Sequence, residues 1–462
     1  MSHWPLTPED ITRPAYRSLA QGIASAIQAG TLQPGDRLPP HRDMAWRLEI
    51  SVQTVSRAYE ELIRADLVTG EVGRGTFVNR GPRETLKMPW HHGATERPPM
   101  DLSLMTPVCL PQIAEAWADS LHRVAGRLPQ GAFHDSRPGR ASSHYGEMAQ
   151  AWLKRCGLTV PRSRILVTNG VTPAMFVALA AVASPGDVIA TESATCHSLR
   201  PVVQHLHMRM QGIAGDERGM LPEALIEAAQ AASGQMKAVF LLPSGAGPFA
   251  RVIDRERRAA LARAAEIAGL VILESDPLGP LVSRRPPPVA SFAPDRTLYF
   301  TGLTKCLAPG LRLGFLVTPD YLTDCAASRH LSVSWMATPL IAEIASDWME
   351  NGSADRLLEA QRAELVLRNR LAQNLLGVRC LGGDQGLHRW LALADTQDER
   401  AFRQTALEHG VAVSAGAGFA VSETGPAVRL CLGGVGLRDL KLALNTLASL
   451  ASVPARPAVE NP

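Results

Sequence analysis

The chain has 462 residues, more than one ordinary domain holds, so two or three domains are expected. An apolar content of 46% with 20% charged residues indicates a globular protein with an ample core, and it excludes a disordered or fibrous chain. The formal net charge of +3 is too small to point to any class of partner.

The cysteine pattern and the apolar runs indicate the cellular compartment in which we expect the protein. The seven cysteines are scattered and form no CxxC pair, which favours reduced thiols over disulfides and predicts no metal site. The longest apolar run, residues 174–183, is about half of a membrane span. The first residues lack the apolar core of a signal peptide. We therefore expect a cytoplasmic protein that does not enter a membrane.

Residues 1–79 predict a winged helix-turn-helix domain. Apolar residues at helical spacing predict a helix over 14–29, and a short helix is expected over 43–48. Ser51 has the character of an N-cap for a third helix that runs to about residue 65. Two short strands around Gly73-Arg74-Gly75 then predict a hairpin with a slim tip.

The third helix has the surface needed to read DNA. The side opposite its apolar positions offers small polar groups and one arginine, which suit contacts to base edges in a major groove. Together with an arginine before it and the hairpin tip, this predicts a set of DNA-contacting residues: Arg42, Gln53, Thr54, Ser56, Arg57, Arg74 and Gly75. Nine arginines and nine acidic residues balance over residues 1–80, so a winged helix used only for protein contacts remains an alternative.

The rest of the chain predicts a linker, an α/β domain and a tail. Residues 80–100 are rich in Pro, Gly and charge and indicate a linker. From 101 to 455 strands and helices alternate, the signature of a mainly parallel sheet. Two late apolar runs, residues 387–391 and 427–432, predict strands of a smaller C-terminal α/β subdomain. Residues 456–462 are expected to be a disordered tail.

Two turns of the α/β domain carry candidate chemistry. The predicted strand 164–168 leads into Gly170-Val171-Thr172, where backbone N–H groups and a hydroxyl at a helix start can meet an anion. A second strand, 297–300, leads into Thr304-Lys305, and the turn that follows can bring Arg312 back to the same place. An amine beside a guanidinium suits a ligand with both a carbonyl and a phosphate.

The lysine is also unusual for this chain. Of the 47 lysine and arginine residues of the chain, only five are lysines, so most positions that need only a positive charge carry arginine. A lysine kept in an apolar strand and turn indicates chemistry that arginine cannot perform. The alternative is a solvated loop lysine.

Both halves of the chain resemble known families. The stretch T-G-L-T-K-C-L-A-P-G-L-R-L-G resembles the pyridoxal-phosphate (PLP) lysine motif of fold-type I aminotransferases. The pattern L-P-x-x-R…V-x-x-T-V-x-R-A-Y-x-x-L…G-x-G-T-F-V resembles the DNA-binding domain of GntR-type regulators. Their order in one chain is similar to that of MocR-type regulators, in which a winged helix precedes an aminotransferase-like domain. The resemblance implies PLP as cofactor and a homodimer.

The resemblance also implies roles for single residues. Lys305 would form the Schiff base with PLP, and the phosphate would be held by Arg312, Thr304 and the turn Gly170-Val171-Thr172. Ser275 falls at the position that faces the pyridine nitrogen. Arg429 matches the arginine that clamps a substrate carboxylate, with an arginine paired on a sheet surface as the alternative reading.

Several positions depart from the family pattern. Gly302 replaces a serine at the phosphate, and Gly247 replaces the asparagine at the phenolic oxygen. Ser275 and Leu278 replace the aspartate and the tyrosine of the E-D-D-x-Y segment, and Cys196 replaces the aromatic residue that covers the ring. Without the aspartate the ring nitrogen is poorly held in its protonated form, so transamination should be slower by on the order of a thousandfold or more.

These departures rank the functional hypotheses. The first is a DNA-binding regulator whose aminotransferase-like domain senses PLP, or an amine or amino-acid effector, without turnover. In the second, the pocket has lost PLP and binds something else. The third is a working PLP-dependent aminotransferase with a DNA-binding appendage. Control of vitamin B6 genes by PLP itself is a variant of the first.

Overall fold

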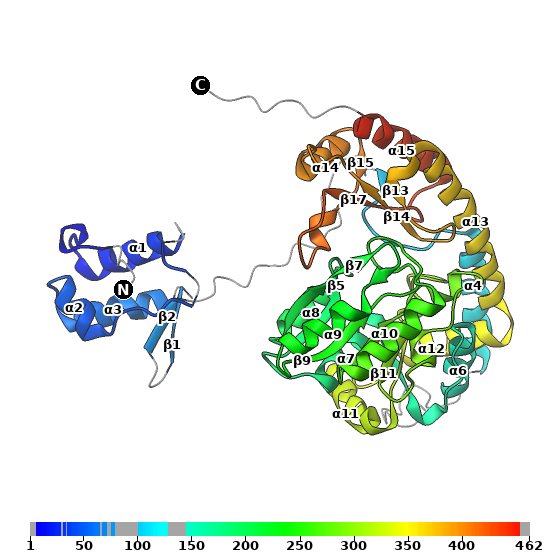
Figure 1. The fold of residues 1–462 in the computed structure, drawn as a ribbon, viewed down its shortest axis with the longest axis horizontal. Helices are drawn as coiled ribbons and strands as arrows, with labels where there is room; N and C mark the ends of the chain where they lie inside the picture. The colour runs from blue at the N-terminus through cyan, green and yellow to red at the C-terminus, as the bar shows by residue number, and fades with distance from the viewer. Residues whose placement is uncertain are drawn as a thin grey trace. The chain divides into compact units, whose positions relative to one another are not determined.

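The computed structural model describes residues 6–28, 31–33, 35–64, 67–71, 75–78, 100–127 and 145–452. The chain divides into two compact units, Met1–Lys87 and Met88–Pro462, each of which we describe by itself (Figure 1). Arg74, nearly all of the predicted linker and the predicted tail at 456–462 lie outside the described residues.

The first unit is the expected winged helix. An apolar face of α1 packs on α3, and the side chains of Leu19, Ile23, Val55 and Tyr59 are at most 1% exposed. The hydroxyl of Ser51 accepts a hydrogen bond from the backbone N–H of Thr54 at 3.0 Å, as the predicted N-cap requires. The elements are η1 (Pro8–Asp10), α1 (Ala15–Gln28), α2 (His41–Arg47), α3 (Val52–Arg64), β1 (Val68–Glu71) and β2 (Gly75–Val78).

The second unit is built on a seven-stranded, mainly parallel sheet. The strand order is β4-β12-β11-β10-β9-β5-β6, and β12 runs antiparallel to both of its neighbours. All other neighbouring pairs are parallel. The strands are β4 (Ile165–Thr168), β5 (Val188–Glu192), β6 (Arg209–Ile213), β9 (Met236–Leu241), β10 (Val271–Ser275), β11 (Thr297–Gly302) and β12 (Gly314–Val317).

Helices cover both faces of this sheet, so its strands are apolar on both sides. Along β9, Ala238 and Phe240 enter one core, whereas Val239 and Leu241 enter the other. The first core is closed by α6 (Gly146–Arg155), α7 (Val171–Val182), α8 (Leu199–His205) and α12 (Pro339–Glu350). The second core is closed by α9 (Pro222–Ala231) and α10 (Arg255–Ile267). Between Gly215 and Met220, β7 (Gly215–Asp216) and β8 (Gly219–Met220) form a small hairpin.

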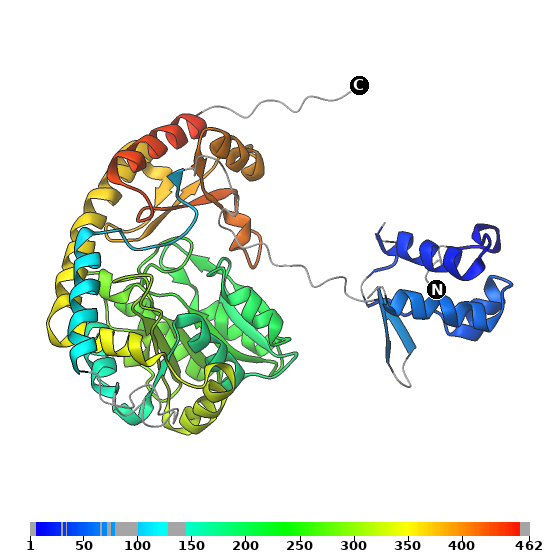
Figure 2. The same cartoon turned by 180° about the vertical axis from the view of Figure 1, so that it is seen from behind.

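A smaller subdomain follows the large sheet, as predicted. Its antiparallel sheet has the order β13-β14-β17-β16, and the long helix α13 extends from the large subdomain to it (Figure 2). The strands are β13 (Cys380–Leu381), β14 (His388–Ala392), β16 (Ser414–Ala415) and β17 (Ala427–Cys431), with the separate pair β3 (Met100–Asp101) and β15 (Val411–Ala412). The remaining helices are α4 (Pro111–Arg127), α11 (Thr323–Ser334), α13 (Ser353–Leu376), α14 (Glu399–Glu408) and α15 (Leu437–Ser452).

Two further observations concern the described chain as a whole. Within the ranges given above, no helix is both long and apolar enough to cross a membrane. All seven cysteines are free thiols, and four of them are buried.

Candidate functional site

Lys305 lies just beyond the end of the buried strand β11. The backbone N–H of Leu303 donates to the Leu313 carbonyl at 3.0 Å, so the loop between them returns to the point where it left the sheet. The Lys305 amine donates a hydrogen bond to the carbonyl of Met105. The sequence therefore placed this lysine correctly at the carboxyl edge of the sheet, where open α/β sheets bind ligands.

The surroundings of Lys305 make its amine reactive. Burial, together with the positive charges of Arg429 and Arg312, lowers the pKa of Lys305 to about 8. A free lysine titrates at about 10.4, so a far larger share of this amine is neutral near neutral pH. A neutral amine is the form that attacks a carbonyl carbon.

Arg312 and the start of α7 form a polar corner beside this amine. Gly170 has φ +102° and directly precedes α7, and a Cβ there would lie 3.6 Å from Nη2 of Arg312. Arg312 and Thr172 are exposed, Val171 is half-buried, and the guanidinium of Arg312 has no hydrogen bond or ion pair within the described ranges. A helix N-terminus beside a guanidinium without a partner is suited to a phosphate.

The glycine that replaces a family serine has a steric reason. A Cβ on Gly302 would lie 2.8 Å from the carbonyl oxygen of Leu313 and 2.8 Å from Cγ2 of Val171. The backbone of the lysine loop and a β-branched residue of α7 thus occupy the space that a serine side chain would need. The hydroxyl of the remaining family position, Thr304, donates to the Leu311 carbonyl at 3.3 Å.

The end of β10 separates Ser275 from Asp276. Asp276 is fully buried, forms an ion pair with Arg285, and accepts a hydrogen bond from the hydroxyl of Tyr299 at 2.6 Å. Both contacts use Oδ2, so the protein holds this carboxylate through one oxygen, while the buried Oδ1 has no hydrogen-bond partner among the described residues. The side chain of Asp276 thus makes contacts that the neighbouring Ser275 does not, as the alternation along a strand predicted. Ser275 and Leu278, both at most 2% exposed, bring no charge.

A histidine of the small subdomain holds the loop of Gly247. The Nε2–H of His388 donates to the carbonyl oxygens of Gly247 at 2.9 Å and Pro248 at 3.2 Å. Burial lowers the pKa of His388 to about 3, so the ring is neutral when it makes these bonds. A Cβ on Gly247 would meet Leu242 at 3.6 Å, an ordinary contact, so the loop itself does not require glycine there.

Arg429 is a buried cation without a counter-ion. It is 2% exposed, its Nη2 donates to the Ser103 carbonyl at 2.7 Å, and its guanidinium lies 4.5 Å from the ring centre of Phe419. In the described part of the chain it has no acidic partner. The alternative reading, an arginine paired on a sheet surface, does not describe this environment. A buried, unpaired guanidinium is suited to a carboxylate brought by a ligand.

An imidazole stands beside the position where the family has an aromatic ring. Cys196 is half-buried, and its sulfur lies 3.6 Å from the hydroxyl of Ser198. The next residue, His197, meets Phe419 edge-on at 6.3 Å. Burial, with the charges of Arg429 and Lys305, lowers the pKa of His197 to about 3.

The predicted DNA contacts that the structure describes lie on the surface of the first unit. Arg42, Gln53 and Arg57 are exposed, whereas Thr54 and Ser56 are half-buried. The guanidinium of Arg57 lies 3.9 Å from the ring centre of Tyr16, so α1 supports its position. The Oγ1 of Thr54 lies 2.8 Å from the hydroxyl of Ser51, so this side chain takes part in the helix cap.

The hairpin adds one residue that the sequence did not single out. Gly75 has φ +121°, and a Cβ there would lie 2.8 Å from Nε of the exposed Arg37. Arg37 also forms a β-bridge with Phe77. The glycine thus permits an arginine to lie against the strand residue next to the hairpin turn, and such an arginine is suited to a contact with a phosphate backbone. Arg37 stands just before the L-P-x-x-R motif, and no spacing rule marks it.

Comparison with protein families decides the identity of the second unit. Residues 111–447 match the model of aminotransferases of class I and II. The chain belongs to this family. Residues 15–78 match the gntR family of bacterial regulatory proteins, so the aminotransferase domain follows a GntR-type DNA-binding domain. This is the MocR-type arrangement that the motifs indicated.

Curated relatives share the arrangement over nearly their full lengths. The HTH-type transcriptional regulator YdeF of Bacillus subtilis is 28% identical over 92% of this chain and 90% of its own. The vitamin B6 salvage pathway transcriptional repressor PtsJ of Salmonella typhimurium is also 28% identical, over 92% of this chain and 95% of its own. The pyridoxine biosynthesis regulator PdxR of Corynebacterium glutamicum is 25% identical over 85% and 87%.

Solved structures confirm the fold of the aminotransferase domain. The kynurenine aminotransferase of Pyrococcus horikoshii has a TM-score of 0.69 at 20% identity, covering 77% of this chain and 91% of that one. A tetra mutant of the aspartate aminotransferase of Thermus thermophilus has a TM-score of 0.62 at 21% identity, covering 78% of this chain and 100% of that one. At this level of identity the likeness concerns the fold alone.

The aminotransferase domain implies PLP as its cofactor, and the described residues fit part of it. The exposed Arg312 beside the Gly170 turn fits a phosphate, and the amine of the half-buried Lys305 fits an aldehyde. Ser275, Leu278 and Gly247 offer no charge to the rest of the cofactor. No three side chains of His, Cys, Asp or Glu come together as a metal site in the described ranges.

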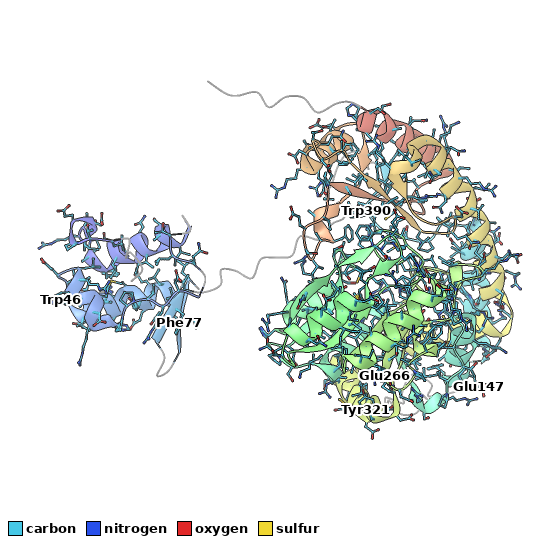
Figure 3. The ribbon with its side chains drawn as sticks, in the orientation of Figure 1. Trp46, Phe77, Glu147, Glu266, Tyr321 and Trp390 are labelled. Atoms are coloured by element: carbon cyan, nitrogen blue, oxygen red, sulfur yellow. The ribbon has the colours of Figure 1, made fainter. Side chains whose placement is uncertain are left out.

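Some residues around the site were missed by sequence reasoning. Trp390 stands edge-on to Phe249 at 5.4 Å and to Phe419 at 6.1 Å, and Figure 3 labels it in the interior of the aminotransferase domain. Cross-strand pairs of β14 and β17 put Trp390 opposite Arg429 and His388 opposite Cys431. The sequence predicted both strands but not their antiparallel register, and this register is what brings these side chains to one face.

Proposed function

We propose that this protein is a cytoplasmic, homodimeric transcriptional regulator whose aminotransferase-like domain binds PLP and senses an amine or amino-acid effector without turnover. The observation that supports this most is the pairing of a half-buried lysine, whose pKa is lowered to about 8, with two guanidinium groups that have no acidic partner among the described residues. Lys305, Arg312 and Arg429 supply binding functions, while no free carboxylate stands at Ser275 to support turnover.

Each residue has a role in this proposal. Arg312, Thr304 and the turn Gly170-Val171-Thr172 hold the phosphate of PLP, and Lys305 presents its amine to the aldehyde. When bound, PLP supplies an aldehyde that condenses reversibly with amines and a ring that withdraws electrons. Ser275 accepts or donates one hydrogen bond at the ring nitrogen, but as a neutral group it does little to hold a proton there.

Arg429 is the proposed effector-binding residue. Its guanidinium pairs with a carboxylate of the effector and thereby ends the burial of an unpaired charge. The effector then shifts the equilibrium between arrangements of the DNA-binding heads, provided that it binds one arrangement more tightly than the other.

The dimer and the operator complete the proposal. Fold-type I domains, which this one resembles, form dimers whose sites draw on both subunits. Leu331, Val333 and Trp335, at the end of α11, are 38%, 39% and 54% exposed, as apolar residues at a subunit contact would be in a single chain. Two heads would read repeated half-sites through the described residues Arg42, Gln53, Thr54, Ser56, Arg57 and Gly75, and through Arg74.

A spectroscopic and kinetic experiment tests the sensor. The purified protein is mixed with PLP and then with a panel of amino acids, while visible absorbance and keto-acid release are both followed. We expect spectral change without sustained keto-acid release, and an effect of PLP or of the amino acid on DNA affinity. Sustained release would identify a working aminotransferase, and the absence of any spectral change would leave a pocket without PLP.

The DNA-binding role is tested by Arg57→Ala. Its affinity for operator DNA, measured by fluorescence anisotropy, should fall by about 1–3 kcal/mol. Arg17→Ala is the matched control, because Arg17 lies 5.8 Å from the same Tyr16 ring but belongs to α1. Unchanged affinity in Arg57→Ala would remove α3 from the groove.

A further inference from the structure

A pocket of about 370 Å³ lies in the aminotransferase domain, and its lining does not include Lys305, Arg312 or Arg429. It is therefore separate from the site described above, although Leu278 borders it. Its volume falls within the range of small-molecule sites. We name it the lateral pocket; among the residues that line it are Ser244, Val252, Leu278, Val366, Arg370 and Asp384.

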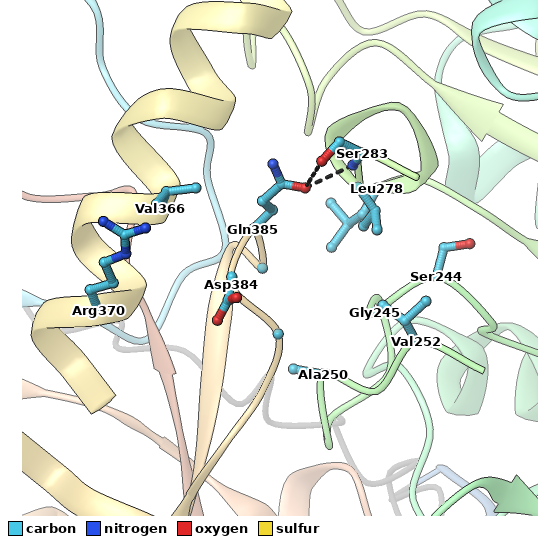
Figure 4. Close-up of a pocket in the computed structure, with 13 residues that line it drawn as sticks. Ser244, Gly245, Ala250, Val252, Leu278, Ser283, Val366, Arg370, Asp384 and Gln385 are labelled. Atoms are coloured by element: carbon cyan, nitrogen blue, oxygen red, sulfur yellow. Dashed lines mark hydrogen bonds between the residues drawn. The ribbon is translucent and has the colours of Figure 1, made fainter. Parts of the chain in front are cut away.

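The lateral pocket has two unlike walls (Figure 4). One wall comes from the large subdomain and is mainly apolar, with Ala250, Val252 and Leu278. The other comes from α13 and the loop before β14, and it carries Arg370, Asp384 and Gln385. A molecule that fills the pocket must therefore contact both subdomains and the helix that joins them.

The wall that carries Arg370, Asp384 and Gln385, which we call the charged wall, has polar groups available to bind a ligand. Arg370 and Asp384 are both exposed, and neither side chain forms a hydrogen bond or ion pair within the described residues. The Oε1 of Gln385 accepts hydrogen bonds from the backbone N–H of Ser283 at 2.7 Å and from its hydroxyl at 2.8 Å. These bonds fix the amide across the seam between the subdomains, and they leave its NH₂ group free to donate.

We propose that the lateral pocket is a second, regulatory site for a small aliphatic amino acid bound as its zwitterion. The carboxylate would pair with Arg370 and the amide of Gln385, and the ammonium group would pair with Asp384. The aliphatic side chain would lie against Val252 and Leu278. Since the pocket bridges the two subdomains, its occupant stabilises the arrangement in which they are seen here.

Calorimetry with L-valine as the probe tests this proposal in full-length protein carrying Lys305→Ala and Arg429→Gln, which disable the other site. Valine should bind in the millimolar range or tighter. Isovalerate lacks the ammonium group and isobutylamine lacks the carboxylate, so each should bind at least about tenfold more weakly, the loss expected for one charge-assisted hydrogen bond.

Variants of the charged wall locate the binding. Adding Arg370→Gln or Asp384→Asn should weaken valine binding at least about tenfold. Arg403→Gln is the matched control, because Arg403 is exposed on α14 and does not line the pocket, and it should leave binding unchanged. Absence of binding at about 20 mM valine, roughly twentyfold above a dissociation constant of about 1 mM, would overturn the proposal. So would isovalerate binding as tightly as valine, or equal affinity in the Arg370 and Asp384 variants.

If the doubly substituted protein does not fold, the same titration is made with the wild-type chain. Valine should then bind to the lateral pocket of the wild-type chain, and Arg370→Gln should weaken this binding at least about tenfold, while the visible spectrum with PLP stays unchanged. Valine binding that Arg370→Gln leaves fully intact would overturn the lateral site. The proposed role of Lys305 is judged separately, by its spectrum with PLP.

Discussion

The proposed phosphate end and the proposed ring end of the Lys305 site differ in how much of the family pattern they keep. At the phosphate end a helix N-terminus, an exposed arginine and a threonine remain, and even the lost serine is explained by the backbone that fills its space. At the proposed ring end, Ser275, Leu278 and Gly247 bring no charge, and the carboxylate of Asp276 contacts Arg285 and Tyr299. On the proposed assignment, groups that would hold a cofactor persist where the charged group that would drive its chemistry is absent.

Among the substitutions that test the two ends of the site, Lys305→Ala should have the largest effect. Without the amine, the aldehyde of PLP has no partner in the site, so the protein should lose all PLP-dependent visible absorbance and all borohydride-stable label. Absorption spectra before and after reduction measure this, with Lys441→Ala as a control at a lysine of α15. A label that survives in Lys305→Ala would show that another lysine reacts.

The pH dependence of labelling tests the reactivity of the same amine. With a pKa lowered to about 8, Lys305 is mostly charged at neutral pH and becomes neutral as the pH rises through 8. The initial rate of trapping PLP with borohydride should therefore rise about tenfold per pH unit between about pH 6 and pH 8 and then level off. A rate that keeps rising to about pH 10 would show an ordinary, solvated lysine.

Arg312→Gln probes the phosphate end. Loss of the guanidinium should weaken PLP binding by about 1.5–3 kcal/mol, the usual contribution of a hydrogen bond to a charged group. Pyridoxal lacks the phosphate, so its weaker binding should be the same in the variant and in the wild type. Titrations followed by absorbance compare the two ligands. If both ligands weaken equally, Arg312 does not hold the phosphate.

Ser275→Asp probes the ring end and should have the smallest effect. A carboxylate at this position would hold a proton on the ring nitrogen and tighten PLP retention, by about tenfold if one charge-assisted hydrogen bond is gained. Dissociation during dialysis measures this, with Ser275→Asn as the neutral control. No gain in either variant would mean that the ring nitrogen does not face residue 275.

The sequence predicted the fold and the lysine loop well because both depend on local patterns. Apolar residues at helical spacing marked the first helix of the winged-helix unit, the N-cap Ser51 marked its third helix, and an apolar run marked the strand over 297–300. The turn after Lys305 marked the return of Arg312. The roles of His388 and Trp390 could not be predicted in this way. Their positions depend on the antiparallel register of β14 with β17 and on contact between two subdomains, which no short stretch of sequence records.

In the winged-helix unit, too, local signals predicted the elements but not the contacts between distant residues. The third helix and its Ser51 cap were predicted from local signals, and the structure bears them out. The contact of Arg57 with Tyr16 joins residues 41 positions apart, and Arg37 reaches the hairpin through a bridge to Phe77. Such long-range contacts decide how an exposed arginine is oriented, and only the folded domain reveals them.

The two hydrogen bonds of His388 have a mechanical consequence. They connect β14 of the small subdomain to the backbone of residues 247 and 248 in the large subdomain, and His388 is fully buried. A rotation of the small subdomain must therefore either move this loop or break both bonds, and breaking them would leave buried polar groups without partners. Such a rotation would act on the loop as a pull on main-chain atoms.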